Sequence, residues 1–166
     1  MVVLLYNRIM QKNSSKIEAS FAKNKKAFAD FEVMEKFEAG IVLAGGEVKS
    51  IREGHAQLKG CFIEIKNGNA FATNIHISKY RYDSAAKLEP ARRRKLLLHA
   101  KEIAKMSIML DSKGMAAIPL ELYGKHGLIK LQIGICRGKK KYDRRNDLKK
   151  RALDLEAAQT LKRFSH

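Results

Sequence analysis

Residues 137–151, RGKKKYDRRNDLKKR, form the densest cluster of charged side chains in the 166-residue chain. Nine of these fifteen residues are Lys or Arg, against two Asp, and one aromatic residue, Tyr142, lies among them. Unpaired charges at this density cannot be buried, because each would lose its hydration. The cluster must stay in water or bind a polyanion, and Tyr142, which has no apolar neighbours, could stack on a base. We predict a nucleic-acid-binding tail; a solvated basic end that only aids solubility remains the alternative.

The net charge of +17 and the pI of about 10.0 are extreme for this length. The charge is also unevenly distributed along the chain. Its sums over successive segments are +5 for 1–27, −1 for 28–86, +5 for 87–105, +1 for 106–136 and +7 for 137–166. Three basic regions on a nearly neutral body are typical of a protein that binds nucleic acid. A membrane surface fits less well, because no strongly basic stretch also carries a wide apolar face.

The sequence contains no recognised catalytic or metal-binding motif. Its five histidines do not pair with carboxylates at a known spacing, and no nucleophile elbow, phosphate-binding loop, dinucleotide fingerprint or HExxH motif occurs. Cys61 and Cys136 are far apart and fall in apolar runs, which indicates buried thiols rather than a disulfide or a metal site. Glu38 and Glu47 could form a carboxylate pair, but separate surface glutamates are far more common. We therefore expect no enzyme activity, no cofactor and no metal.

No membrane association is expected either. No segment approaches the roughly 18–20 apolar residues that a membrane span needs. Residues 1–10, MVVLLYNRIM, lack the basic start and the small-residue cleavage site of a signal peptide. Together with the cysteine pattern, these features predict a cytoplasmic protein.

The pattern of short apolar runs predicts a mainly β fold. Asn67-Gly68 separates two alternating runs, and this dipeptide favours a type I′ turn, which needs positive φ at both central positions. Residues 127–136 alternate in the same way, with four aliphatic side chains on one face. Two short runs within residues 115–123 flank Pro119, which suits an edge strand or the end of a strand.

A helix is predicted between Pro90 and Gly114, which have the character of start and stop signals. An apolar stripe at helical spacing from Leu96 to Ile108 supports this prediction. The first turns would carry residues 92–95, RRRK. Because cations at a helix N-terminus oppose the helix dipole, this placement indicates an external anionic partner.

Short strands, glycine-rich corners and one or two flanking helices together predict a small, mostly antiparallel barrel of the oligonucleotide-binding (OB) type. Residues 1–23 lack sustained periodicity and are predicted to form a flexible N-terminal extension. Residues 24–137 would form the OB-like RNA-binding barrel, and residues 138–166 a basic C-terminal tail. The tail is rich in helix formers but has a broken apolar stripe, so we predict disorder in the free protein and a helix on a partner.

Six motifs occur together and in order. They are NKKA at 24–27, FEAGIVLAGGEVKSIREG at 37–54, HIS at 76–78 after the Asn-Gly hairpin, EPARRRKLLLH at 89–99, PLELY at 119–123 and GKKKYDRRNDLKKR at 138–151. In combination they resemble the SsrA-binding protein (small protein B) family of bacterial trans-translation. The resemblance covers nearly all of residues 24–151. The chain departs from the family pattern after NKKA, where Phe28 and Ala29 replace the usual basic or histidine residues.

The resemblance implies a function. Members of the family bind transfer-messenger RNA (SsrA RNA) and help to deliver it, charged with alanine, to ribosomes stalled on messages without a stop codon. The barrel holds the tRNA-like part of this RNA, and the tail enters the empty messenger channel and the decoding centre of the small subunit. Elongation factor Tu and alanyl-tRNA synthetase would be indirect partners. The protein itself would catalyse no reaction.

The resemblance also implies which residues bind RNA. In the barrel they are Asn24, Lys25, Lys26, Glu38, Leu97 and Lys130. In the tail, toward the decoding centre, they are Gly138, Lys139, Lys140, Tyr142, Asp143, Arg144 and Arg145. The lysines can neutralise phosphates, whereas an ionised Glu38 can only accept hydrogen bonds, for example from base amino groups or ribose hydroxyls. On helix periodicity alone, Leu97 would instead be a core residue.

Two other function classes remain open. A generic structural or assembly protein of the ribosome would share the basic patches without needing a particular RNA acceptor arm. An enzyme acting on RNA would consume its substrate. Discrimination of transfer-messenger RNA from bulk RNA separates the adaptor from both.

Overall fold

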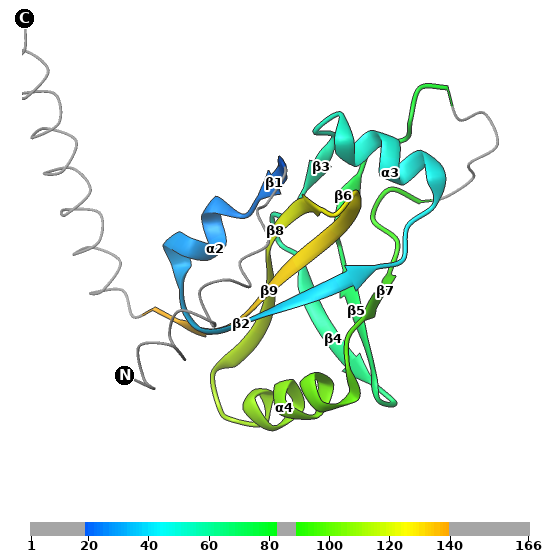
Figure 1. Cartoon of the computed structure of the whole chain (residues 1–166). Helices are drawn as coiled ribbons and strands as arrows, with labels where there is room; N and C mark the ends of the chain where they lie inside the picture. The colour runs from blue at the N-terminus through cyan, green and yellow to red at the C-terminus, as the bar shows by residue number, and fades with distance from the viewer. Residues whose placement is uncertain (1–18, 83–88, 140–166) are drawn as a thin grey trace, which may run out of the picture.

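The computed structural model describes residues 19–82 and 89–139 (Figure 1). In chain order its elements are β1 (Ala19–Lys23), α2 (Lys25–Asp30), β2 (Phe31–Ile41), α3 (Gly45–Arg52), β3 (Ala56–Gln57), β4 (Phe62–Lys66), β5 (Asn69–Thr73), β6 (His76–Ile77), β7 (Arg94–Leu97), α4 (Ala100–Leu110), β8 (Met115–Lys125) and β9 (Leu128–Gly138). Within these two ranges, no helix has both the length and the apolar character needed to cross a membrane.

Seven strands form one antiparallel sheet in the order β1-β8-β9-β2-β7-β5-β4, and β3 pairs separately with β6. Figure 1 shows α3 at one end of the molecule, next to β3 and β6, and α4 at the opposite end. The two end strands of the sheet, β1 and β4, do not pair with each other, although β4 contacts β8. The predicted mainly β, antiparallel class is therefore confirmed, but the strands described do not close into a hydrogen-bonded barrel.

Two hairpin turns use left-handed backbone conformations. Asn67 and Gly68, between β4 and β5, have φ values of 51° and 67°, which is the positive φ pair that a type I′ turn requires. His126 and Gly127, between β8 and β9, have φ values of 52° and 71°. Two-residue turns fix the strand register, so each hairpin determines which of its side chains face the core.

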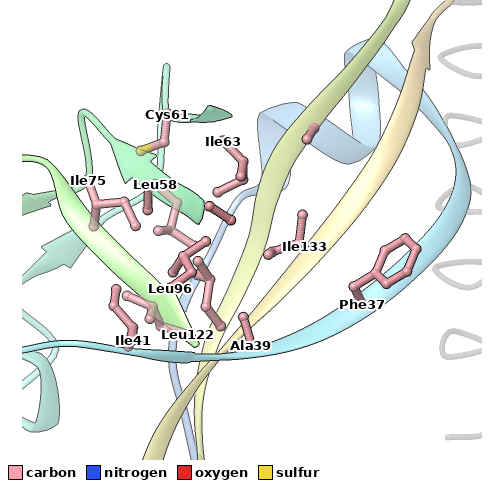
Figure 2. Close-up of a cluster of buried hydrophobic side chains, with 14 of the residues drawn as sticks. Phe37, Ala39, Ile41, Leu58, Cys61, Ile63, Ile75, Leu96, Leu122 and Ile133 are labelled. Carbon is pink, nitrogen blue, oxygen red and sulfur yellow. The ribbon is translucent and has the colours of Figure 1, made fainter. Parts of the chain in front are cut away.

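The main core lies where the apolar faces of the strands meet (Figure 2). In β9, every second residue from Ile129 to Ile135 has an aliphatic side chain that faces the core. These side chains are no more than 9% exposed, as their spacing in the sequence predicts. β2, β4 and β7 contribute their own alternate positions to the same cluster. The labelled core residues in Figure 2 are Phe37, Ala39, Ile41, Leu58, Cys61, Ile63, Ile75, Leu96, Leu122 and Ile133.

The predicted helix begins later than expected. Residues 94–97 pair with β2 and β5 as strand β7, so α4 starts only at Ala100. The Glu102 carboxylate supports this start by accepting a hydrogen bond of 2.8 Å from the His99 backbone N–H. The stop signal was identified correctly, since α4 ends at Leu110 and Gly114 follows with a φ of 84°.

β8 passes through Pro119 instead of ending there. The strand runs from Met115 to Lys125 between β1 and β9, so it is not an edge strand, and Pro119 is fully buried. Its register with β9 shifts between Pro119 and Glu121. Such an irregularity accommodates a residue that has no N–H to donate to the sheet.

The predicted N-terminal extension is partly ordered. β1 pairs with β8 in antiparallel register, from Ala19 opposite Gly124 to Lys23 opposite Glu121. The prediction of a flexible segment over 1–23 is therefore wrong for residues 19–23. Residues 1–18 lie outside the described ranges.

Candidate RNA interface

Three of the predicted RNA-binding residues line one groove across neighbouring strands. Glu38 comes from β2, Leu97 from β7 and Lys130 from β9, and the groove they share has a volume of about 640 Å³. The register explains how they meet, because Gly40 of β2 is the partner of both Leu97 and Lys130. Directly paired residues present their side chains on the same face of a sheet, so Leu97 and Lys130 flank position 40. We call this the Glu38 groove.

The absence of a side chain at Gly40 keeps this face open beside Leu97. A Cβ atom at position 40 would lie 3.1 Å from Cβ and 3.3 Å from Cδ1 of Leu97. Leu97 is 57% exposed, whereas the preceding Leu96 is 2% exposed. This alternation is that of a strand with one buried face, so the helix-based interpretation of Leu97 as a core residue is wrong. The groove thus presents an exposed leucine beside a lysine.

Glu38 is held in place by two donors from β8. The Tyr123 hydroxyl donates to Oε2 at 2.6 Å, and the Lys125 ammonium lies 2.8 Å and 3.0 Å from the two carboxylate oxygens. Partial burial alone would raise the pKa of Glu38, but these hydrogen bonds and the charges of Lys125 and Lys130 outweigh it and lower the pKa. Burial and the bond to Glu38 raise the pKa of Tyr123. Glu38 is therefore held as an anion, and the Tyr123 hydroxyl remains protonated.

The same groove contains groups that the sequence did not single out. Lys95 of β7 and the segment around His99 line it together with the predicted residues. Tyr123 and Lys125 bond to Glu38 but do not line the groove themselves. The signal for Tyr123 was present in the PLELY motif, but its contact with Glu38 joins residues 85 positions apart and could not be read from spacing.

The arginines at 92–94 do not form the basic helix start that the sequence predicts. Arg94 is completely buried, and its guanidinium contacts Glu47 at 2.8 Å and 3.0 Å and the Ile75 carbonyl oxygen at 2.7 Å. Arg92 adds two further bonds to Glu47, at 2.6 Å and 2.9 Å. Arg92 and Arg94 thereby tie α3 to the strands; Arg94 is buried, Arg92 is partly buried and Arg93 is exposed.

Glu47 is the centre of this ion-pair cluster. Burial would raise its pKa, but hydrogen bonds from Arg92, the Ala44 backbone and Arg94 outweigh that effect and lower the pKa. Glu38 has its own partners on β8, so each carboxylate is neutralised separately. The hypothetical carboxylate pair of Glu38 and Glu47 is not formed.

Three aromatic side chains on or near the strands, which could stack on bases if they are exposed, differ in their exposure. Phe62 is 45% exposed. The guanidinium of Arg93 covers the Phe71 ring at 3.9 Å from its centroid while also pairing with Glu64. Tyr80 contacts the Lys49 ammonium, 5.2 Å from its ring centroid, and the ring of Tyr82. Of these three rings, Phe62 is the one with a large open face.

The N-terminal set is divided between fold and surface. Asn24 is 5% exposed; its amide donates to the carbonyl oxygens of Leu58 and Pro119, and its side-chain oxygen accepts from the Ala27 N–H. All of these groups are engaged within the protein, so Asn24 caps α2 and holds it against β8. Its predicted contact with RNA stays a prediction, beside this structural role. Lys25 and Lys26 are exposed on α2 and stay candidates.

The predicted tail begins later than residue 138. Gly138 is the last residue of β9 and pairs with Phe31. The Lys139 N–H donates to the Asp30 carbonyl oxygen at 3.0 Å, so both residues are attached to the sheet. Lys140, Tyr142, Asp143, Arg144 and Arg145 lie outside the described residues.

The two cysteines are buried thiols. Burial raises the pKa of each to about 11, although Arg94 partly opposes this at Cys61. Both are therefore poor nucleophiles near neutral pH. Across residues 19–82 and 89–139, no group of three or more His, Cys, Asp or Glu side chains could hold a metal ion.

Comparison with known proteins shows close relatives. The family described as SmpB protein matches residues 21–163. The chain is 48% identical over 145 residues to an SsrA-binding protein of Geotalea uraniireducens, which covers 87% of this chain and 96% of the relative. An SsrA-binding protein of Staphylococcus carnosus is 44% identical over 153 residues, with 92% and 98% covered. A solved chain described as "tmRNA-SmpB: a journey to the center of the bacterial ribosome" matches with a TM-score of 0.62 at 38% identity, over 72% of this chain and 84% of that one.

Proposed function

The chain belongs to the SmpB protein family, and on this premise we propose that it is an RNA-binding adaptor of trans-translation. It binds transfer-messenger RNA and helps to deliver this RNA to stalled ribosomes, which leads to ribosome rescue and to tagging of the incomplete protein. The observation that carries the proposal is the groove in which Glu38, Leu97 and Lys130 meet across three strands.

The chemistry of the Glu38 groove suits a folded RNA with unstacked bases. Lys130 and Lys95 can neutralise phosphates and release their counterions. Leu97 offers an apolar surface to an exposed base. The ionised Glu38 can accept hydrogen bonds from base amino groups or ribose hydroxyls but repels phosphates, so it favours one arrangement of the RNA over others. The groove therefore combines affinity with selection.

The C-terminal segment supplies the ribosome contact in this proposal. Residues 140–151 are rich in Lys and Arg and contain Tyr142, a combination that suits a charged RNA channel with bases available for stacking. We assign Lys140, Tyr142, Asp143, Arg144 and Arg145 to the decoding centre and the empty messenger channel. The protein acts by binding rather than by catalysis, and its ribosomal partner implies a cytoplasmic location.

The test is binding of the purified full-length protein to transfer-messenger RNA, in competition with excess ordinary tRNA at physiological salt. We expect tight binding to persist, and Lys130→Ala to weaken it while Lys113→Ala, outside the groove, leaves it unchanged. Complete displacement by tRNA would contradict the adaptor function. It would favour the generic ribosome-associated structural protein, which should copurify with every ribosome in equal amount.

A further inference from the structure

A second groove lies between α2, the start of β4 and the first half of β8. Its floor is apolar and consists of Ala27, Phe31, Phe62, Ala116 and Ile118. Its volume of about 590 Å³ falls within the ~300–1,000 Å³ typical of ligand pockets. It shares no lining residue with the Glu38 groove. We call it the α2 groove.

The α2 groove coincides with the place where the barrel is not closed. β4 is an end strand of the sheet, and β1 pairs with β8 only between Glu121 and Gly124. The part of β8 that contains Ala116 and Ile118 therefore has no β1 partner, and Phe62 remains 45% exposed beside it. The open edge therefore leaves the apolar ring of Phe62 available for another segment to pack against.

The chain itself leaves the described structure at the rim of this groove. The Lys139 N–H donates to the Asp30 carbonyl oxygen at 3.0 Å, and the Lys139 ammonium donates to the Phe28 carbonyl oxygen at 3.3 Å. Asp30 and Phe31 both line the groove. Residues 140–166 are thus tethered next to it, which corresponds to an effective concentration on the order of millimolar.

One stretch of that C-terminal segment fits the groove in both charge and hydrophobicity. Residues 152–158, ALDLEAA, carry two leucines and two acidic side chains and no basic one, whereas residues 139–151 are strongly basic. The groove rim carries the exposed Lys26 and Lys59 against one acidic residue, Asp30. Residue 153 can also reach the groove, because Lys139 lies at the groove rim. The fourteen residues from Lys139 to residue 153 span about 21 Å as a helix and about 46 Å when extended.

We propose that residues 152–158 dock in the α2 groove of their own chain in the free protein. Leu153 and Leu155 pack on the apolar floor, and Asp154 and Glu156 lie near Lys26 and Lys59. Docking leaves the basic side chains of residues 140–151 available to RNA. The fold thereby holds the end of the tail on the body until a stronger partner for the tail is present.

Paramagnetic relaxation in the full-length protein tests this contact directly. A spin label on Gln159→Cys can be attached selectively, because Cys61 and Cys136 are buried and their pKa values are about 11. We expect the methyl signals of Ala27 and Ile118 to lose more than half of their intensity. Leu153→Ser combined with Leu155→Ser should restore them, whereas Leu148→Ser combined with Leu161→Ser should not. Absence of broadening, or equal recovery in both double variants, would overturn the proposal.

Charge reversal provides an independent readout. Lys59→Glu should weaken the broadening at least twofold, and adding Asp154→Lys and Glu156→Lys should restore it, while Lys101→Glu on α4 should have no effect. Broadening between labelled and isotope-enriched molecules mixed in one sample would instead identify a second copy as the occupant and refute the intrachain contact. The assay contains no RNA, so its failure leaves the proposed function intact.

Discussion

Glu38 places a negative charge inside a groove that we propose binds a polyanion, and its neighbours explain how it is retained there. Lys125 and Lys130 neutralise the local potential, while Tyr123 fixes the direction of the carboxylate oxygens. A carboxylate held in this way cannot turn aside when RNA approaches. An RNA group at this position must either donate a hydrogen bond to the carboxylate or be repelled by it. Glu38 therefore contributes more to the selection of the RNA than to affinity.

Tyr123→Phe tests this role at the level of a single hydroxyl group. The substitution removes the donor at 2.6 Å from Glu38 but leaves the ring, so Lys125 alone holds the carboxylate and the pKa of Glu38 rises toward its ordinary value. We expect the preference for transfer-messenger RNA over ordinary tRNA to fall about fivefold, which is about 1 kcal/mol. Filter binding against excess tRNA measures it. Tyr82→Phe, at a residue 77% exposed, is the matched control, and an equal loss in both variants would rule out the positioning role.

Glu47→Gln tests the buried ion-pair cluster. It leaves the guanidinium of the fully buried Arg94 without a charge partner, so we expect the free energy of unfolding to fall by about 3–5 kcal/mol. Urea denaturation measures the change. Glu53→Gln, which removes an exposed pair with His55, should stay within about 0.5 kcal/mol of the parent. A loss of similar size in both variants would show that burial of Arg94 is not the cause.

The Glu47 carboxylate should also make the stability of the fold depend on pH, in a direction that its pKa shift determines. The pKa of Glu47 is lower in the folded protein than its ordinary value of 4.5, so its contribution to stability is present above pH 4.5 and is lost as the pH falls through the folded pKa. Thermal unfolding should therefore show a steep loss of stability below about pH 4.5. The slope should be shallower in Glu47→Gln, and an unchanged slope would contradict this linkage.

Among the elements, the hairpin between β4 and β5 was predictable and the strand β7 was not. Asn67 and Gly68 predict their turn because few residue types tolerate positive φ, and this tolerance can be read from the sequence itself. Residues 94–97 follow an apolar pattern that fits a helix as well as a strand, and pairing with β2 and β5 decides between them. Burial of Arg94 depends on Glu47, forty-seven positions earlier, so no local pattern could indicate it.

The candidate site shows the same division between local and distant information. The resemblance to the family implied Glu38, Leu97 and Lys130 one by one, but only the register of β7, β2 and β9 brings them into a single groove. For Asn24, the resemblance indicated an RNA contact, but the sequence could not show the structural role that the fold gives to this side chain. In the fold its carboxamide binds three backbone groups within the protein.

Gly40→Ala tests the packing of β2 against β7. The new methyl group would lie 3.1 Å from Leu97 Cβ, so Leu97 must shift. Because Leu97 is 57% exposed, we expect affinity for transfer-messenger RNA to fall by about tenfold with the melting temperature nearly unchanged. Gly45→Ala is the control, since a methyl group there meets no atom within 4 Å. Strong unfolding in Gly40→Ala without a change in affinity would contradict this role of the glycine.

At the scale of the whole molecule, the net charge of +17 has more than one role. Arg92 and Arg94 neutralise the buried Glu47, and Arg93 stacks on Phe71, whereas Lys95, Lys130, Lys25 and Lys26 are on the surface. A count of basic residues therefore overstates the charge that RNA meets. The number of positive charges that contact RNA is best measured from the dependence of binding on salt concentration.

Affinity for transfer-messenger RNA should depend strongly on salt. If about five phosphates are neutralised, the logarithm of the binding constant should fall with the logarithm of the salt concentration at a slope of about −3 to −5. Lys130→Ala should reduce the magnitude of the slope by about 1, whereas Arg92→Ala should not change it if the protein remains folded. A flat dependence would show that the basic surface is not where RNA binds.

β9 connects the two ends of the proposed activity. The strand carries Lys130 in the Glu38 groove and, eight residues later, Gly138, after which Lys139 is tied to Asp30. At about 3.3 Å per residue these two points are roughly 26 Å apart along one strand that is paired on both sides. The strand therefore fixes the distance and the direction between the Glu38 groove and the start of the C-terminal segment. When RNA binds in the groove, the position of that start relative to the RNA is set as well.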